Sequence, residues 1–179
     1  MTPEDQKRYA PERVWVSNGM EALIRFLCPL DDAEMREFYN AVPSEDKRFY
    51  PATLEELDKK LAECEKPNAV HLVITTAQGL IFGHAYYRWD GDDSEKSTFG
   101  ICIRPGYQGI GAGKALMNRL LDISREIGPP VMCLTVQKAN ERAFEMYKKM
   151  GFRVIREQTV GERFGFPAEP EYYMERVLR

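Results

Sequence analysis

The sequence predicts a single domain of the α/β (α+β) class, in which a mixed β-sheet carries helices on both faces. The length of 179 residues suits one domain that is large enough to bury a substantial core. Hydrophobic residues make up 44% of the chain and charged residues 30%, which is typical of a globular protein. Strand-like and helix-like segments follow one another in the order ββααββ and then βαβαββ, an order that builds a mixed sheet flanked by helices.

The first half of the chain is predicted to contain two β-hairpins with two helices between them. Asn18-Gly19 is a typical hairpin turn and joins the first two strands. Thr53 and Glu56 have the spacing of a capping box, so a helix is expected to begin at Thr53. The expected elements are strands at 13–16 and 21–27, helices beginning at Asp31 or Asp32 and at Thr53, and strands at 70–76 and 80–89.

The second half is predicted to alternate strands and helices before it ends in two more strands. Apolar residues between Leu116 and Ile127 recur at spacings of four, three and four, which places them on one helix face. Asn140 is a good N-cap for the next helix, and Gly151 suits its end. The expected elements are a strand at 98–103, a helix from about 111 to 127, a strand at 131–136, a helix at 140–149, and strands at 152–160 and 172–178.

The bulk properties argue against several functional classes. A net charge of −3 does not favour a nucleic-acid binder that relies on a basic surface. No stretch approaches the roughly 20 apolar residues of a membrane span, and the N-terminus lacks the apolar core of a signal peptide. The four cysteines form no Cys-x-x-Cys pair and the two histidines have no clustered partners, so no metal site is expected. We therefore expect a cytoplasmic protein with reduced cysteines and no nucleic-acid or membrane partner.

The segment from Arg104 to Leu116 carries the clearest binding motif. It has glycine at positions 106, 109, 111 and 113, and it joins a predicted strand to a predicted helix. Such a turn directs several backbone N–H groups at one point, in front of the positive end of the helix dipole, and so forms a site for phosphate or pyrophosphate. It is not a P-loop, because Gln108 and Ala115 stand at required positions, and it is not a dinucleotide fingerprint, because Lys114 or Leu116 replaces the last glycine.

Two patterns in the second half of the chain follow one another in order. The first is Gln-x-x-Gly-x-Gly, at Gln108, Gly111 and Gly113. The second runs from Asn140 to Phe152 as Asn-x-x-Ala-x-x-x-Tyr-x-x-x-Gly-Phe. Together, at this separation, they resemble the pyrophosphate loop and the following helix of the GNAT superfamily of acetyl-CoA-dependent N-acetyltransferases.

The resemblance implies a GNAT-like fold with a mixed, mostly antiparallel sheet. It covers about residues 20–179, so we expect the N-acetyltransferase domain there, and in residues 1–19 an N-terminal extension with the first hairpin strand. The opening segment is loosely similar to that of bacterial protein-lysine acetyltransferase domains. Dimers are common in the superfamily, so a homodimer is compatible with the resemblance, although no sequence feature requires one.

The resemblance also implies which residues contact acetyl-CoA, the expected cosubstrate. The acetyl carbonyl is expected to face backbone N–H groups just before the glycine-rich loop, and the pyrophosphate to lie on the amides of that loop. The Tyr147 hydroxyl is expected near the CoA sulfur. The expected cofactor-binding residues are Ile101, Cys102, Ile103, Gln108, Gly109, Ile110, Gly111, Ala112, Gly113, Lys114, Asn140 and Tyr147.

Direct acetyl transfer needs a base for the amine and an acid for the departing thiolate. Tyr147 is the expected catalytic acid, because a phenol pKa near 10 suits a thiol leaving group of somewhat lower pKa. Many relatives carry a glutamate two residues before the position of Gly100, where this chain has Thr98. Glu95 and His84 are therefore the candidate catalytic bases, and a chain of water molecules is the remaining alternative. His84 is also compatible with a purely structural, hydrogen-bonded strand histidine.

The expected acceptor is a primary amine, of a small molecule or of a protein lysine, that attacks the thioester directly. Thr98 at the usual position of the base leaves a second hypothesis, a non-catalytic acyl-CoA-binding regulatory module. A longer acyl donor is a further alternative. The aromatic residues expected near the acceptor are Phe49, Tyr50, Trp89, Phe164, Phe166 and Tyr172.

Overall fold

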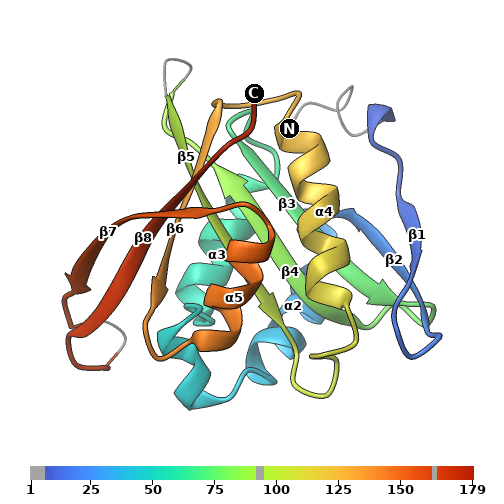
Figure 1. The fold of residues 1–179 in the computed structure, drawn as a ribbon. Coiled ribbons are helices and arrows are strands. Elements are labelled where there is room, and N and C mark those ends of the chain that lie inside the picture. The colour runs from blue at the N-terminus through green and yellow to red at the C-terminus, as the bar shows by residue number, and fades with distance from the viewer. Residues whose placement is uncertain (1–6, 92–94, 163–164) are drawn as a thin grey trace.

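Strands from both ends of the chain join one mixed sheet (Figure 1). The structure is a computed structural model that describes residues 7–91, 95–162 and 165–179. Within these residues the sheet has eight strands in the order β1-β2-β3-β4-β5-β6-β8-β7, and only β5 and β6 pair in parallel. The strands are β1 (Glu12–Trp15), β2 (Glu21–Phe26), β3 (Ala69–Thr76), β4 (Ile81–Arg88), β5 (Lys96–Ile103), β6 (Val131–Gln137), β7 (Arg153–Val160) and β8 (Glu169–Val177).

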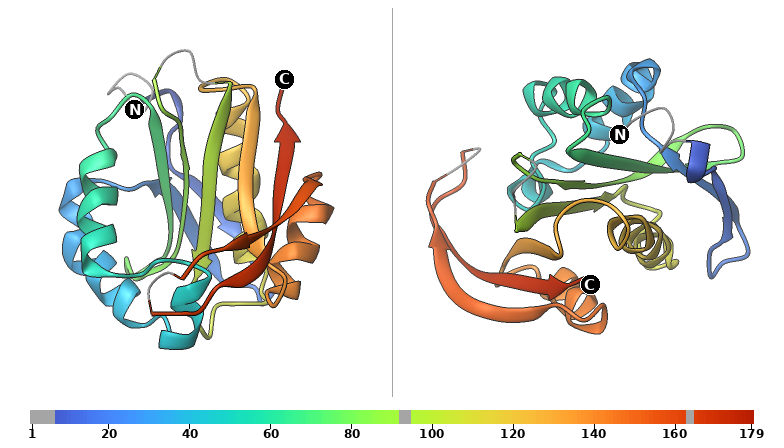
Figure 2. Two further views of the ribbon diagram at one scale, coloured as in Figure 1. Left: turned by 90° about the vertical axis from the view of Figure 1, so that its left-hand side faces the viewer. Right: turned by 90° about the horizontal axis from the view of Figure 1, so that it is seen from above.

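Four α-helices, α2 to α5, lie against the two faces of this sheet in the described part of the chain. In Figure 2 the sheet lies between a layer that holds α2 and α3 and a layer that holds α4 and α5. The predicted mixed, mostly antiparallel sheet with helices on both faces is therefore confirmed. The helices are α2 (Asp32–Asn40), α3 (Leu54–Glu63), α4 (Ala112–Ser124) and α5 (Glu141–Lys149), with two short 3₁₀ helices, η1 (Pro29–Asp31) and η2 (Ser44–Arg48).

Most element boundaries follow from local signals that the sequence shows. The Thr53 hydroxyl accepts a hydrogen bond from the Glu56 backbone N–H at 3.2 Å, which caps α3 as predicted. The α4 helix ends at Ser124, earlier than expected, and η2 was not predicted. A five-residue 3₁₀ turn has too few residues to show a hydrophobic period, so the sequence pattern could not reveal it.

Two apolar clusters pack on opposite faces of the sheet and alternate along its central strands. In β3, Val70 and Leu72 belong to the cluster under α4, whereas Val73 belongs to the cluster under α2 and α3. This alternation follows from the two-residue repeat of a strand. Because both faces of β3 are covered, all eight of its residues are buried. The described residues contain no helix that is both long and apolar enough to cross a membrane.

Candidate active site

The parallel strands β5 and β6 separate part of the way along their length. Their pairing covers only Lys96–Thr98 against Val131–Cys133. Beyond Thr98, β5 continues to pair with β4 alone. The backbone groups of residues 99–103 on the β6 side therefore lie outside any strand ladder, where they are available to a ligand that binds along the strand.

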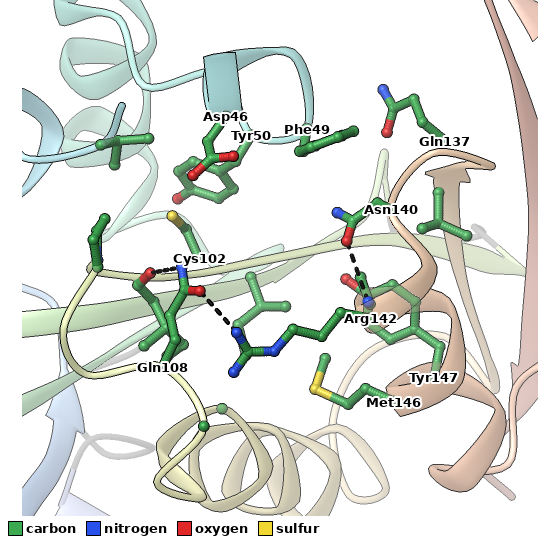
Figure 3. Close-up of a pocket in the computed structure, with 18 of the residues that line it drawn as sticks. Asp46, Phe49, Tyr50, Cys102, Gln108, Gln137, Asn140, Arg142, Met146 and Tyr147 are labelled. Carbon is green, nitrogen blue, oxygen red and sulfur yellow. Dashed lines mark hydrogen bonds between the residues drawn. The ribbon is translucent and has the colours of Figure 1, made fainter. Parts of the chain in front are cut away.

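A pocket of about 490 Å³ lies where the two strands diverge, and Figure 3 shows its lining. It is bordered by β5 and β6, by the glycine-rich loop before α4, by the start of α5, and by η2 with the residues next to it. Nearly all of the expected cofactor-binding residues meet here. The lining residues are Val42, Pro43, Asp46, Phe49, Tyr50, Ile101, Cys102, Ile103, Pro105, Gln108, Gly109, Gly111, Gly113, Lys114, Thr135, Val136, Gln137, Asn140, Arg142, Ala143, Met146 and Tyr147.

The glycine-rich loop needs its glycines for backbone reasons. Gly109 and Gly111 have φ angles of +82° and +87°, in the left-handed region that other residues rarely adopt. Gly111 is also the N-cap of α4, so the free N–H groups of the first helical turn begin at this point. A Cβ atom at Gly111 would meet no atom within 4 Å, which means that conformation and not crowding demands glycine there. The loop thus offers amides and a helix dipole to an anion.

Ile110 and Ala112 do not line the pocket, although both were expected to bind the cofactor. Ala112 is buried in the apolar cluster under α4, and Ile110 packs against that same cluster. Their side chains anchor the loop to the core. The contribution expected from these two residues was a backbone amide, so their side-chain positions leave that prediction open.

Arg142 lies at the pocket but was not among the expected site residues. Its Nη1 donates to Oε1 of Gln108 at 2.9 Å, and Nε2 of Gln108 donates to the Ile103 carbonyl oxygen at 3.0 Å (Figure 3). These bonds tie the start of α5 to the glycine-rich loop. The sequence did contain a signal, since a cation in the first turn of a helix opposes the helix dipole and calls for another reason to be there.

Asn140 and Tyr147 lie on α5 on the same side of the pocket. The side-chain oxygen of Asn140 accepts from the Ala143 backbone N–H at 3.2 Å, so Asn140 is the predicted N-cap. Tyr147 borders the pocket while its ring packs against Phe99 and Phe152. Burial raises the pKa of the Tyr147 hydroxyl well above its usual value of about 10, so this phenol keeps its proton at neutral pH.

Cys102 lies across the pocket from Tyr147 (Figure 3). Burial raises the pKa of its thiol to about 12. A thiol becomes a good nucleophile only as the thiolate, so this cysteine is not activated for a covalent acyl intermediate. The chemistry of the pocket therefore favours direct attack by the acceptor over a relay through cysteine.

The η2 segment borders the end of the pocket away from the glycine-rich loop. Asp46, Phe49 and Tyr50 line this end, and among the residues that the structure describes Asp46 is the only carboxylate in the lining. Of the aromatic residues expected near the acceptor, Phe49 and Tyr50 line the pocket, and Trp89, Phe166 and Tyr172 do not. Phe164 lies outside the described residues.

The structure separates the two candidate bases. Glu95 is exposed and precedes β5, so it lies about 20 Å along the strand from Ile101, the first residue of β5 that lines the pocket. Thr98 is likewise exposed and does not line the pocket. His84 has no exposed surface and does not border the pocket itself, but its Nδ1 is hydrogen-bonded to the hydroxyl of Tyr50, which does.

Comparisons with known proteins agree with this arrangement. The model of the Acetyltransferase (GNAT) family matches residues 30–152. L-amino acid N-acyltransferase MnaT of Escherichia coli (strain K12) is 26% identical over 148 residues, which cover 79% of this chain and 86% of that protein. The GNAT domain of S. lividans PAT has a TM-score of 0.78 at 18% identity and covers 93% of this chain and 96% of that chain. The protein yncA of Salmonella typhimurium, solved with its cofactor acetyl-CoA, has a TM-score of 0.71 at 24% identity, and the match covers 87% of this chain and 93% of that chain. Because the family model spans more than half of the sequence, the chain belongs to the acetyltransferase (GNAT) family, as its motifs predict, and it uses acetyl-CoA to acetylate an amine.

Proposed function

We propose that the chain transfers the acetyl group of acetyl-CoA to the primary amine of a small molecule, in the pocket between β5 and β6. The observation that carries this proposal is the separation of β5 from β6 directly in front of the glycine-rich loop. It combines a free strand edge, which suits an extended amide-containing chain, with an anion site at a helix N-terminus. Acetyl-CoA suits this combination, because its long pantetheine arm can lie along the strand edge and its pyrophosphate can occupy the anion site.

The expected roles of the site residues fit this pocket. The loop amides between Gln108 and Lys114 would hold the pyrophosphate, and Arg142 would add a second positive charge beside the loop. The backbone of Ile101 to Ile103 would donate to the thioester carbonyl as negative charge develops there. Tyr147, which holds its proton, would donate it to the departing thiolate.

The charges along the pocket support a cationic acceptor. Lys114 and Arg142 border the glycine-rich end, and Asp46 borders the opposite end. An ammonium group would be attracted to Asp46, and the CoA phosphates to the basic end. The relative named L-amino acid N-acyltransferase supports a small acceptor such as an amino acid over a protein lysine.

The test is a thiol-release assay with acetyl-CoA and four classes of acceptor: amino acids, polyamines, other small amines and lysine-containing proteins. Calorimetric titration with CoA runs beside it. We expect release with a small amine and saturable binding of CoA. Binding of CoA without thiol release in the presence of any acceptor would support the regulatory-module hypothesis. Faster thiol release from a longer acyl-CoA than from acetyl-CoA would show that the longer acyl group is the preferred donor.

The place of action and the oligomeric state are also proposals. We propose the cytoplasm as the place of action, because the four cysteines in the described residues are free thiols, as a reducing compartment maintains. A homodimer is proposed only on the family resemblance, and the molecular mass in solution would decide it.

A further inference from the structure

Four side chains connect the pocket to the far end of α3 beneath the helical layer of α2 and α3. Tyr50 borders the pocket, and its hydroxyl is hydrogen-bonded to Nδ1 of His84. Nε2 of His84 lies 3.2 Å from Nδ1 of His71, and Nε2 of His71 lies 3.4 Å from Oε2 of Glu63. We call this series Tyr50, His84, His71 and Glu63 the side-chain relay.

The strand register places the two histidines together. Val73 of β3 is opposite His84 of β4, so His71 lies diagonally across from His84 on the same face of the sheet. Their rings are stacked, with centroids 5.4 Å apart and an angle of 13° between the planes. Both histidines are buried, with exposures of 0% and 2%, so water does not compete for their ring nitrogens.

Glu63 influences which ring nitrogens of the side-chain relay donate hydrogen bonds and which accept them. Its Oε1 accepts from Arg88 at 2.9 Å, while its Oε2 and Nε2 of His71 face each other at 3.4 Å, and neither of these two buried atoms makes a hydrogen bond among the described residues. Contact with His71 and the charge of Arg88 lower the pKa of Glu63 to about 2, so it is a carboxylate that can only accept.

The tautomers of both histidines follow from that carboxylate. The nearby carboxylate favours the tautomer of His71 that carries its proton on Nε2, which leaves its Nδ1 free to accept from Nε2 of His84. The Nδ1 of His84 then has no proton and accepts from the Tyr50 hydroxyl. The Tyr50 hydroxyl also contacts the Tyr39 hydroxyl, so its oxygen keeps one lone pair to receive a proton from a ligand in the pocket that Tyr50 borders.

We propose that the Tyr50–His84 pair is the proton acceptor for the attacking amine, and that Glu63, acting through His71, holds His84 in the tautomer that can receive the proton. This inference rests on the proposed function. Tyr50 is the catalytic residue in it, since it borders the pocket, and His84, His71 and Glu63 act through Tyr50.

The proton step balances as follows. The amine nitrogen forms a bond to the thioester carbon, its proton moves to the Tyr50 oxygen, and the original Tyr50 proton moves to Nδ1 of His84. The tetrahedral intermediate then breaks its C–S bond, and the thiolate takes a proton from Tyr147. When the products leave, His84 returns its proton through Tyr50 to water in the pocket, and Tyr147 is reprotonated from that water. The net result moves one amine proton to the CoA thiol.

The surroundings of His84 favour the neutral form of its imidazole, so a proton that it accepts is readily passed on. The titratable groups around it are Tyr50, His71 of β3, Tyr86 of β4, Lys60 of α3 and Cys102 of β5. Burial, followed by the nearby His71 and Lys60, lowers the pKa of His84 well below its usual value, so the imidazole is neutral and ready to accept. Tyr50 and Tyr147 lie on opposite sides of the pocket, as acid and base must for a substrate between them (Figure 3).

The main test compares Glu63→Gln with Glu55→Gln. Both changes remove one carboxylate from α3, but Glu55 is 81% exposed and does not contact the side-chain relay. The amide of glutamine can donate or accept, so it no longer selects one tautomer of His71. For Glu63→Gln we expect kcat to fall at least about tenfold, with the KM for acetyl-CoA unchanged and a shifted acidic limb of the pH profile. Glu55→Gln should behave like the wild type.

Two further measurements protect the test against loss of folding. Tyr50→Phe keeps the ring and should lower kcat about a hundredfold while leaving CoA binding intact. Nitrogen-15 NMR of the wild-type imidazoles should show both histidines with the proton on Nε2. The proposal is overturned by unchanged kcat in Glu63→Gln or Tyr50→Phe, or by a proton on Nδ1 of either histidine. An active wild type with unaffected variants removes this inference alone, whereas a wild type that acetylates no amine removes the proposed function too.

Discussion

Acidification from pH 7 to pH 5 should destabilise the folded protein through its two buried histidines. Burial lowers the pKa of both His71 and His84, so the folded protein binds fewer protons than the unfolded chain does below about pH 6.5. Stability is therefore fully present above pH 6.5 and is lost as the pH falls below it. This change of stability with pH is opposite in sign to that caused by a histidine that a partner keeps charged in the folded protein, which loses stability as the pH rises.

The size of the effect follows from the number of protons. Each proton that only the unfolded chain binds changes the free energy of unfolding by about 1.4 kcal/mol per pH unit. Integrated from pH 7 to pH 5 with an unfolded pKa of about 6.5, one histidine contributes at most about 2 kcal/mol, and the pair at most about 4 kcal/mol. That ceiling is a large share of a typical unfolding free energy of 5–15 kcal/mol.

The window between pH 5 and pH 6.5 isolates these residues. The chain has only two histidines. Glu63, whose pKa is lowered to about 2, stabilises the fold above about pH 4.5 and loses that contribution only below it. Burial lowers the pKa of Lys60 to about 8, so Lys60 makes the stability depend on pH only in the alkaline range.

The assay is urea unfolding at half-unit steps from pH 5 to pH 7.5, with the free energy extrapolated to water. The slope below pH 6 should correspond to between one and two protons. A flat or falling free energy as the pH rises through this window would mean that the imidazoles are charged in the folded protein. It would also refute the hydrogen-bond direction assigned to the side-chain relay.

Three substitutions test separate parts of the pocket. Tyr147→Phe should lower kcat roughly a hundredfold and leave CoA affinity in calorimetry unchanged, and normal turnover would remove Tyr147 as the acid. Arg142→Gln should raise the KM for acetyl-CoA about tenfold with little change in kcat, because it removes one charge beside the glycine-rich loop; an unchanged KM at low salt would count against that role. Asp46→Asn should raise the KM for the acceptor up to about fivefold and leave that for acetyl-CoA unchanged, whereas the reverse pattern would contradict the charge division of the pocket.

The sequence predicted the fold well because its signals are local. The Asn18-Gly19 turn, the Thr53 cap and the apolar repeat of α4 each involve residues within a few positions of one another. Every strand and α-helix that these signals predict is present in the described structure. The glycine-rich loop was also readable, since the φ angles of Gly109 and Gly111 require the residue that the sequence shows.

The parts that escaped prediction depend on contacts between distant segments. Tyr50, His71 and His84 come from three separate elements, and only the register of β3 against β4 brings the two rings together. The register of β3 against β4 shifts at an irregularity between Ile74 and Thr75, and local periodicity does not reveal such a shift. For the same reason the sequence offered His84 and Glu95 as equal candidates, although one contacts a pocket residue and the other lies beyond the far end of β5.

The position of Thr98 now has a different meaning. In the sequence, threonine at that position suggested that the catalytic base had been lost. In the structure, Thr98 lies where β5 still pairs with β6, before the pocket begins, and it is exposed. A carboxylate at that position would lie on the same face of β5 as Cys102, but about 13 Å along the strand from that pocket residue. A base must instead come from residues that border the pocket or are hydrogen-bonded to them. Among the described residues both Asp46 and Tyr50 with His84 meet that condition, and the Tyr50–His84 pair lies opposite Tyr147. The missing glutamate is thus no argument against catalysis, and it makes the Tyr50–His84 pair the first place to look for the base.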